Sequence, residues 1–340
     1  MIRYTYVIII ILNLLTIALA QDVSFSGWGK TGLRIFDRNI NEGYSQETYY
    51  EGKFQADIEF NKNIEAQLDF RGNSIDNSLE FREFSMKFKY SDKLQWKIGH
   101  IKKPFGYEQS VQRERLISVD RSNVYNTFAE LGYGGRSVSI MAYRKFSKKY
   151  PEFPFSYYVS VSKDNSFNTS LTARGIYHDG KYSYGMSYMF QNFGGRIDIK
   201  THGLTANFLI DKKNYTNSIE VFFVQDPVEG KIRDEHEKEG ESEQNEIVYA
   251  AGAKLLTSLS FDTDADVIKK IEPLILVSYL VPDIDVTDNH VIQFLIGSNF
   301  YFTKKVMLRF NGDFRLTKNQ YNDDYVTNQS RVIIELQARF

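Results

Sequence analysis

The chain of 340 residues is long enough for one large domain or two ordinary ones. It has no cysteine, which excludes disulfides, thiolate nucleophiles and cysteine-based metal sites. Its 42 basic and 43 acidic residues nearly cancel, so nothing indicates nucleic acid as a partner. With 26 Phe and 23 Tyr, the chain is rich in aromatic residues, yet its mean hydropathy is −0.40. That combination is typical of a barrel with an apolar outside and a wet inside.

The first twenty residues have the pattern of an export signal. Arg3 supplies a positive charge, Val7 to Leu15 is almost wholly apolar, and Ala18-Leu19-Ala20 offers the small residues that signal peptidase recognises. A transmembrane anchor is the alternative, but this apolar run is shorter than the ~20 residues of a spanning helix. We therefore expect residues 1–20 to be a signal peptide and residues 21–340 to be the mature protein.

The mature sequence alternates between polar and apolar residues, which indicates strands with two unlike faces. In KFQADIEF, residues 53–60, every second residue is apolar. A coarse reading predicts sixteen strands, at residues 23–35, 49–60, 64–72, 80–90, 94–103, 134–145, 154–163, 169–177, 181–190, 201–211, 218–225, 247–259, 271–281, 290–302, 306–317 and 331–340. No mature segment has the long unbroken apolar run that a transmembrane helix requires.

Strands of a soluble sandwich and strands of a membrane barrel both alternate between polar and apolar residues, so alternation alone does not distinguish the two folds. The lengths of the connections between strands help to do so. Tight turns are expected at 61–63, 91–93, 178–180 and 303–305, and long polar connections at 36–48, 104–133, 226–246 and 318–330. Long turns at 146–153 and 260–270 and a short loop at 164–168 depart from this scheme. Short turns on one rim, long loops on the other and an even strand number favour a bacterial barrel.

The last strand, RVIIELQARF, ends at the terminal Phe340. Its apolar face is regular, and Ile333 is the exception on its polar face. A terminal aromatic residue resembles the signal that barrel-assembly machinery recognises, although an ordinary edge strand is the alternative. Aromatic residues near the short turns agree with an interfacial girdle: Tyr90, Trp96, Phe300 and Phe302. We predict an all-β transmembrane antiparallel β-barrel of about 16 strands, in contact with the lipid and lipopolysaccharide of a Gram-negative-type outer membrane.

The stretch from Leu79 to Arg144 carries a recognisable pattern. Its matching residues are Gly99, Lys102, Pro104, Phe105, Gly106 and Glu108, then Asp120-Arg121-Ser122, then Gly135-Arg136. This resembles the phosphate-selective porin O/P family over about a fifth of the chain. The resemblance implies an outer-membrane porin, an inward-folded third external loop that narrows the pore, and an anion filter. A trimer is also expected by resemblance.

Residues 104–133 form the longest expected connection and are too apolar for a loop in solvent. We expect this loop to fold inward and constrict the pore; a lid across the mouth is the alternative. Five basic residues are candidates for the constriction and for solute binding: Lys102, Lys103, Arg113, Arg115 and Arg121. Four acids lie in the same stretch: Glu108, Glu114, Asp120 and Glu130.

The alternation also predicts a lumen wall of mixed charge. Its basic residues are Lys53, Arg71, Lys87, Lys89, Lys97, Arg309 and Arg315. Its acids are Asp57, Glu59, Glu65, Asp69, Glu83, Asp313 and Glu335. An anion preference would require the bases to cluster in space.

Other motifs favour no site chemistry. Residues 226–246 hold nine acids and three bases and are expected to be a solvated loop, with cation bridging to lipopolysaccharide as a minor alternative. The run Asp262 to Asp266 fails the calcium-loop pattern, because Val267 stands where a Gly is needed. Five scattered histidines form no ligand pair, and no Gly-x-Ser-x-Gly elbow is present. We expect no metal, no cofactor and no enzymatic activity.

Together these patterns predict an outer-membrane porin that lets small hydrophilic solutes pass by diffusion. Anions such as phosphate are the candidate solutes that the resemblance implies. The alternative is a structural or adhesive barrel without transport.

Overall fold

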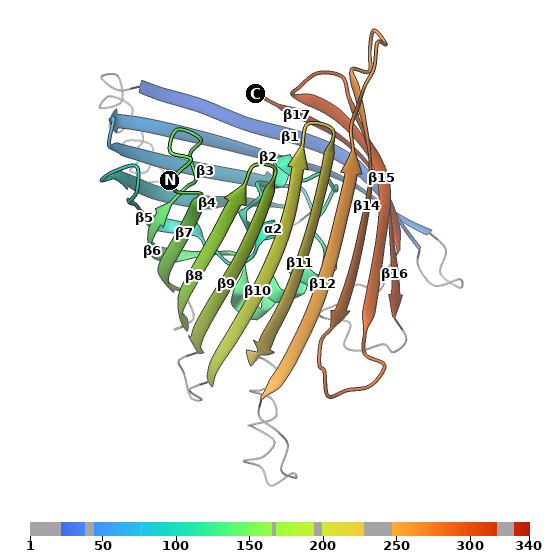
Figure 1. Ribbon diagram of the computed structural model, residues 1–340. Coiled ribbons are helices and arrows are strands. Elements are labelled where there is room, and N and C mark those ends of the chain that lie inside the picture. The colour runs from blue at the N-terminus through green and yellow to red at the C-terminus, as the bar shows by residue number, and fades with distance from the viewer. Residues whose placement is uncertain are drawn as a thin grey trace, which may run out of the picture.

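The computed structural model describes residues 22–37, 44–75, 77–164, 168–193, 199–227, 247–317 and 330–340. The expected signal peptide lies outside the described residues, as do nearly all of the acidic segment 226–246 and residues 318–329. The described chain is mainly one curved antiparallel sheet that surrounds a few short helices (Figure 1).

The strands follow one another around the sheet in chain order. The first eight are β1 (Asp22–Asp37), β2 (Tyr44–Asn61), β3 (Ile64–Asn73), β4 (Ser78–Lys89), β5 (Gln95–Lys102), β6 (Arg136–Arg144), β7 (Phe155–Lys163) and β8 (Asn168–Asp179). The others are β9 (Tyr182–Phe193), β10 (Ile199–Lys212), β11 (Tyr215–Asp226), β12 (Val248–Leu259), β13 (Phe261–Asp262), β14 (Lys270–Val281), β15 (Val291–Tyr301), β16 (Val306–Thr317) and β17 (Arg331–Arg339).

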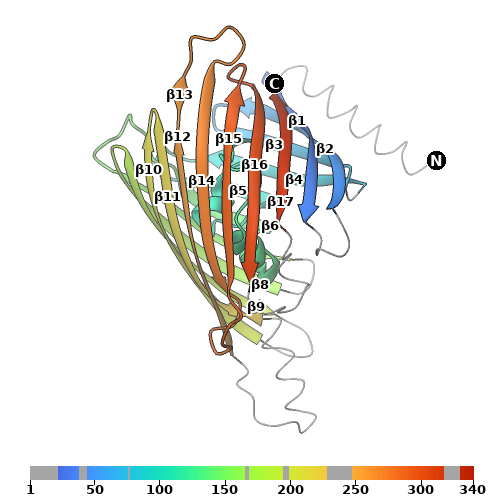
Figure 2. The same ribbon diagram turned by 90° about the vertical axis from the view of Figure 1, so that its right-hand side faces the viewer.

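The sheet closes on itself, because β1 pairs with β17 as well as with β2. The two-residue β13 continues the line of β12, and both pair with β14. The described strands therefore make a closed barrel of sixteen strands, as the alternation predicts (Figure 2).

One expected connection is wrong. The long loop placed at 36–48 is mostly strand, because the β1–β2 pairing runs on through Phe36↔Ser45 and Asp37↔Tyr44. The polar residues of this hairpin extend two long strands instead of forming a loop, which leaves only residues 38–43 between them.

The outer face of the barrel is apolar and the inner face is largely polar. Outward side chains such as Phe54, Phe84 and Ile140 are about half exposed, whereas inward residues such as Asp69 and Glu83 are buried inside the barrel. No helix among the described residues is long and apolar enough to cross a membrane. The apolar outer face of the strands is the face that would meet lipid.

The connection between β5 and β6 lies inside the barrel (Figure 1). It contains the short helices α2 (Tyr107–Ser110) and α3 (Asn123–Phe128), the 3₁₀ turn η1 (Arg113–Arg115) and the π-helical turn η2 (Ala129–Tyr133). The side chain of Ser122 caps α3 by accepting a hydrogen bond from the Tyr125 N–H at 3.2 Å. We call residues 103–135 the inward loop.

Candidate functional site

Apolar side chains of the inward loop pack on one half of the barrel wall. Phe105, Val124, Phe128, Leu131 and Tyr133 form one buried cluster with inward residues of β9, β11, β12, β14 and β15, which are Met189, Phe222, Val224, Ala250, Leu280 and Val291. Nearby, Ile117 packs against a second cluster: Leu256, Leu274, Leu276 and Leu295. Each of these side chains, when fully buried, contributes about 1.5–3 kcal/mol relative to an exposed position. The loop is therefore held on the wall from β9 to β15.

A buried ionic cluster fastens the start of the loop. Lys254 Nζ of β12 lies 2.6 Å from Glu108 Oε2 and 3.3 Å from Glu220 Oε2 of β11. The Glu108 N–H donates to Glu220 Oε2 at 3.1 Å. Burial raises the pKa of Glu108, but Lys254 and Arg121 lower it by more, so its net pKa lies below the ordinary value. Glu108 therefore remains a charged partner of Lys254 at neutral pH.

The residues that carry the family resemblance also make the contacts that hold the start of the loop. Gly106 has φ +78°, and a Cβ there would lie 2.7 Å from Glu220 Oε1, so glycine permits the close approach. The Ser122 hydroxyl donates to Glu108 Oε2 at 2.7 Å, and the Arg121 guanidinium donates to the Glu108 carbonyl. The pattern Phe-Gly-x-Glu and Arg-Ser thus serves to hold the loop, whatever the solute.

A line of cavities lies between the inward loop and the opposite wall. The central cavity, of about 420 Å³, is bounded by inward residues of β1 to β6 and by the loop from Gln109 to Asn126. The outer cavity of about 520 Å³ shares Arg113, Arg121 and Asn126 with it. The inner cavity of about 320 Å³ shares Trp28, Lys53, Gln112 and Glu114 with it and reaches Phe340. We call these three adjoining cavities the passage.

Basic residues outnumber acidic residues along the passage. Nine bases line the central cavity: Lys53, Arg71, Arg82, Lys97, Lys102, Arg113, Arg121, Arg136 and Lys145. Three acids line it: Asp69, Glu83 and Glu114. The outer cavity has five bases, among them Arg34, Arg315 and Arg331, and two acids, Asp120 and Glu130. The bases therefore gather in space, a feature that the sequence did not indicate.

Lys102 and Arg121 have no carboxylate partner among the ion pairs of the described residues. Lys102 Nζ donates to the carbonyl oxygens of Gln109 and Val111 at 3.2 and 3.3 Å. Arg121 Nη2 donates to the same Val111 carbonyl at 2.9 Å, and the guanidinium lies 4.5 Å from the Tyr125 ring centre. These carbonyl oxygens orient both side chains at the lining of the central cavity.

The expected constriction residues separate into two groups. Lys102, Arg113 and Arg121 line the central cavity, and Arg115 lines the inner one. The placement expected for Lys103 is contradicted, because its side chain is 2% exposed and bonds to the Gly132 carbonyl and to Asp164 at 2.9 and 3.0 Å. Lys103 follows the last β5 residue, and it closes the base of the loop instead of facing a solute.

The expected wall residues also divide. Lys53, Arg71 and Lys97 line the central cavity, and Arg315 lines the outer one. Lys87 pairs with Glu65 and Lys89 with Asp92, and neither lines the passage. Arg309 is 1% exposed and bonds to the Ser118 carbonyl at 3.3 Å, which contradicts a solute-facing position. The inward loop covers it.

Several passage bases were not expected. Arg34 and Arg331 lie near the ends of their strands, and Arg136 begins β6. Arg82 lies at a register shift between β3 and β4, where Glu83 pairs with Asp69 and Phe81 with Phe70. Strict alternation would place Arg82 on the same face as Phe84, so only the bulge explains its position at the passage. Among the described residues, no group of three or more His, Asp or Glu is placed to hold a metal ion.

Comparison with solved structures agrees with the barrel fold. OmpF of Salmonella typhi in complex with daunomycin has a TM-score of 0.68 and 13% identity, covering 94% of this chain and 98% of that one. An anion-selective porin from Comamonas acidovorans also has a TM-score of 0.68, with 11% identity and coverage of 94% and 100%. The trimer form of OmpT from Vibrio cholerae has a TM-score of 0.62, with 10% identity and coverage of 94% and 99%.

No protein-family model matches the sequence, and no curated protein matches it. The likeness to these three structures establishes the fold alone, because their sequences are so different.

Proposed function

We propose that the chain is an outer-membrane porin of a Gram-negative-type bacterium, which lets small hydrophilic solutes diffuse through the passage. The observation that carries this proposal is the line of adjoining polar cavities that the inward loop leaves open beside β1 to β6. The structural neighbours include OmpF and an anion-selective porin, which supports the same assignment. Passive diffusion requires no reacting group, so the proposal includes no enzymatic activity and no cofactor.

Anions are the preferred solutes in this proposal. Selectivity in a wide pore follows the charge of its lining, and the central cavity has nine bases against three acids. Lys102 and Arg121 are the first candidates for solute contact, followed by Arg113 and Arg115. The resemblance to the phosphate-selective porin O/P family favours phosphate as one such anion. The inward loop serves as the constriction.

Assembly and processing complete the proposal. We propose removal of residues 1–20, insertion by barrel-assembly machinery that recognises Phe340, and assembly into a homotrimer within lipid and lipopolysaccharide. The trimeric form of one structural neighbour supports the oligomeric state. A structural or adhesive barrel remains the second candidate, because the acidic segment 226–246 follows β11 at the long-loop rim.

Planar-bilayer recording tests the channel. Purified protein should produce discrete conductance steps, and their absence would reject a porin in favour of a structural barrel. In asymmetric potassium chloride, the reversal potential should indicate preference for chloride, and a preference for potassium would reject the anion proposal.

A double variant and a control variant then test whether basic residues of the lining determine the ion selectivity. The double variant Lys102→Gln with Arg121→Gln removes two unpaired cations from the central cavity, so the reversal potential should move toward that of a non-selective pore. Lys103→Gln is the matched control, because it removes a neighbouring lysine that the loop covers. An equal shift in both would place the filter elsewhere.

A further inference from the structure

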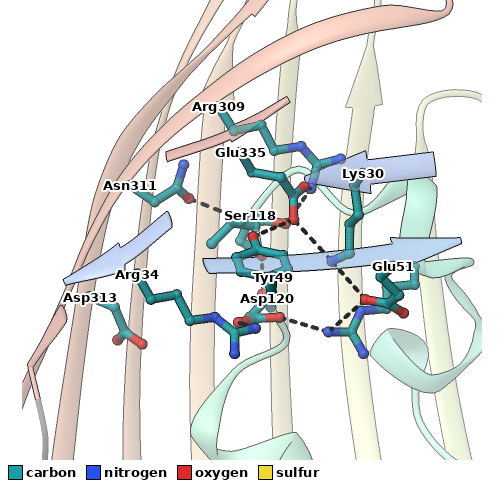
Figure 3. A network of polar contacts seen from close by, with 12 residues as sticks. Lys30, Arg34, Tyr49, Glu51, Ser118, Asp120, Arg309, Asn311, Asp313 and Glu335 are labelled. Atoms are coloured by element: carbon teal, nitrogen blue, oxygen red, sulfur yellow. Dashed lines mark hydrogen bonds and ion pairs between the residues drawn. The ribbon is translucent and has the colours of Figure 1, made fainter. Parts of the chain in front are cut away.

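The tip of the inward loop, residues 117–121, lies against the seam where the first strand, β1, meets the last, β17. Val119 forms one buried cluster with Tyr49 of β2 and Ile333 of β17. The Val119 N–H also donates to Asn311 Oδ1 of β16 at 3.2 Å. The tip therefore contacts strands on both sides of the seam (Figure 3).

A charge network of the wall lies beneath the tip. Lys30 Nζ of β1 is 3.1 Å from Glu51 Oε2 of β2 and 2.9 Å from Glu335 Oε2 of β17. Arg309 Nη1 of β16 is 3.6 Å from Glu335 Oε1, and the Tyr49 hydroxyl donates to Glu335 at 2.7 Å. The four charged side chains are at most 3% exposed. Burying such charges costs free energy that only complete pairing and hydrogen bonding offset.

Asp120 lies at the edge of this network, where the tip meets the outer cavity (Figure 3). Its carboxylate is 3.1 Å from Arg113 Nη2 of the loop, 3.2 Å from Arg331 Nη2 of β17 and 3.8 Å from Arg34 Nη2 of β1. Two of these guanidinium groups come from the strands that form the seam. Burial raises the pKa of Asp120, but Arg331 and Arg113 lower it by more, so the net pKa lies far below the ordinary value.

We infer that Asp120 is a positioning residue for permeation: it fastens the loop tip across the seam and offsets part of the charge of three guanidinium groups, each of which also pairs with a carboxylate of the wall, Glu47, Glu51 or Asp313. The contacts to Arg34 and Arg331 fix the distance between the loop and the wall, and thereby the width of the passage. The same contacts reduce the positive charge of the outer cavity. This inference rests on the proposed channel function.

The first experiment compares D120N with D57N in planar bilayers. Asp57 lines the inner cavity and accepts a hydrogen bond only from Gln55 among the described side chains, so D57N removes one passage charge without touching the loop. D120N should lose the single conductance level and fluctuate among several levels. It should also shift the reversal potential toward anions by more than D57N. A steady level in D120N, with a shift equal to that of D57N, would overturn the inference.

A second variant keeps the test decisive if D120N does not fold. R34Q breaks the longest of the three contacts, together with the pair of Arg34 with Glu47 on β2, and leaves the pair of Asp120 with Arg331 in place. Both variants loosen the tip, but R34Q removes a cation, so it should fluctuate while its reversal potential moves away from anions. A variant that shifts selectivity without fluctuation would contradict the positioning role.

An engineered disulfide tests whether holding the loop tip on the wall restores the single conductance level of D120N. The chain has no cysteine, so V119C with I333C introduces one pair at side chains of the same buried cluster. In the D120N background, oxidation should restore the single conductance level, and reduction should abolish it again. The altered reversal potential should persist in both states, because the carboxylate is still missing. If the unmodified protein conducts but oxidation restores nothing, the inference fails; if it does not conduct at all, the channel function itself fails.

Discussion

The two sides of the barrel wall differ in their inner faces, although their outer faces are alike. From β2 to β5, inward positions hold charged residues such as Lys53, Asp69, Glu83 and Lys97, which line the passage. From β11 to β15, inward positions hold apolar residues such as Val224, Leu276 and Leu295, which the inward loop covers. The inner face of a barrel strand therefore reflects what covers it: water on one side of this barrel and protein on the other.

We expect the largest loss of stability when the ionic cluster on the covered side is broken. Lys254→Met removes the ammonium that pairs with both Glu108 and Glu220, so we expect a loss of about 3–5 kcal/mol in stability. Unfolding by urea in lipid vesicles measures it. Lys213→Met, on an exposed turn, is the matched control and should leave the midpoint unchanged. Equal midpoints for the two variants would mean that the loop is held by its apolar contacts alone.

Loss of an apolar contact on the covered side should reduce stability somewhat less than loss of the ionic cluster. Leu280→Ala opens a cavity beneath the loop, at a side chain that is fully buried, and we expect a loss of about 2–5 kcal/mol. Leu255→Ala removes the same atoms from the outer face, where lipid fills the space, so its effect should be smaller. The same unfolding assay compares them. A larger loss for Leu255→Ala would contradict the assignment of the two faces.

The charge difference between the two sides predicts a difference in selectivity. Lys97→Gln removes a base from the central cavity, so anion preference should fall, by less than in the double variant at Lys102 and Arg121. Arg309→Gln removes a base that the loop covers, so the reversal potential should not move even if stability falls. A shift in Arg309→Gln would show that solutes reach the wall behind the loop.

The smallest expected effect concerns pH. Burial raises the pKa of Glu130 at the outer cavity above its ordinary value of 4.5. As the pH falls through this raised pKa, the carboxylate takes up a proton and loses its charge, so anion preference should increase slightly on mild acidification. Reversal potentials recorded from about pH 7 to about pH 4 test this prediction. Glu130→Gln should reduce the change in this range, and an undiminished change would assign it to other groups of the passage.

The sequence predicts the barrel well because period-two alternation and turn residues are local signals. The number of strands is confirmed, and most strand ends lie within a few residues of their predicted positions. The error at 36–48 arises because polar residues in a paired extension resemble a loop. The inner faces of β11 and β14 carried a further signal, since VFFV and PLILV are apolar on both faces. A strand that is apolar on both faces is covered on both.

The site was less predictable, because alternation assigns a side chain to a face and says nothing of what covers that face. Lys103 and Arg309 belong to the inner side, yet neither reaches the passage. Ile333, the exception in the last strand, is explained by Val119, which packs against it. Arg82 depends on a bulge that no sequence pattern marked. The contacts that decide the site join residues far apart in the chain.

The inward loop has a consequence for biogenesis. It precedes in the chain nearly all of the wall that covers it: Ser118 bonds to Arg309, 191 residues later, and Asp120 to Arg331, 211 residues later. Contacts of such long range form slowly, since a large chain entropy is lost before they are made. Until β9 to β15 are made, Phe105, Val124 and Phe128 lack their partners on the wall and are prone to self-association. The chain is therefore most prone to self-association while its C-terminal half is missing.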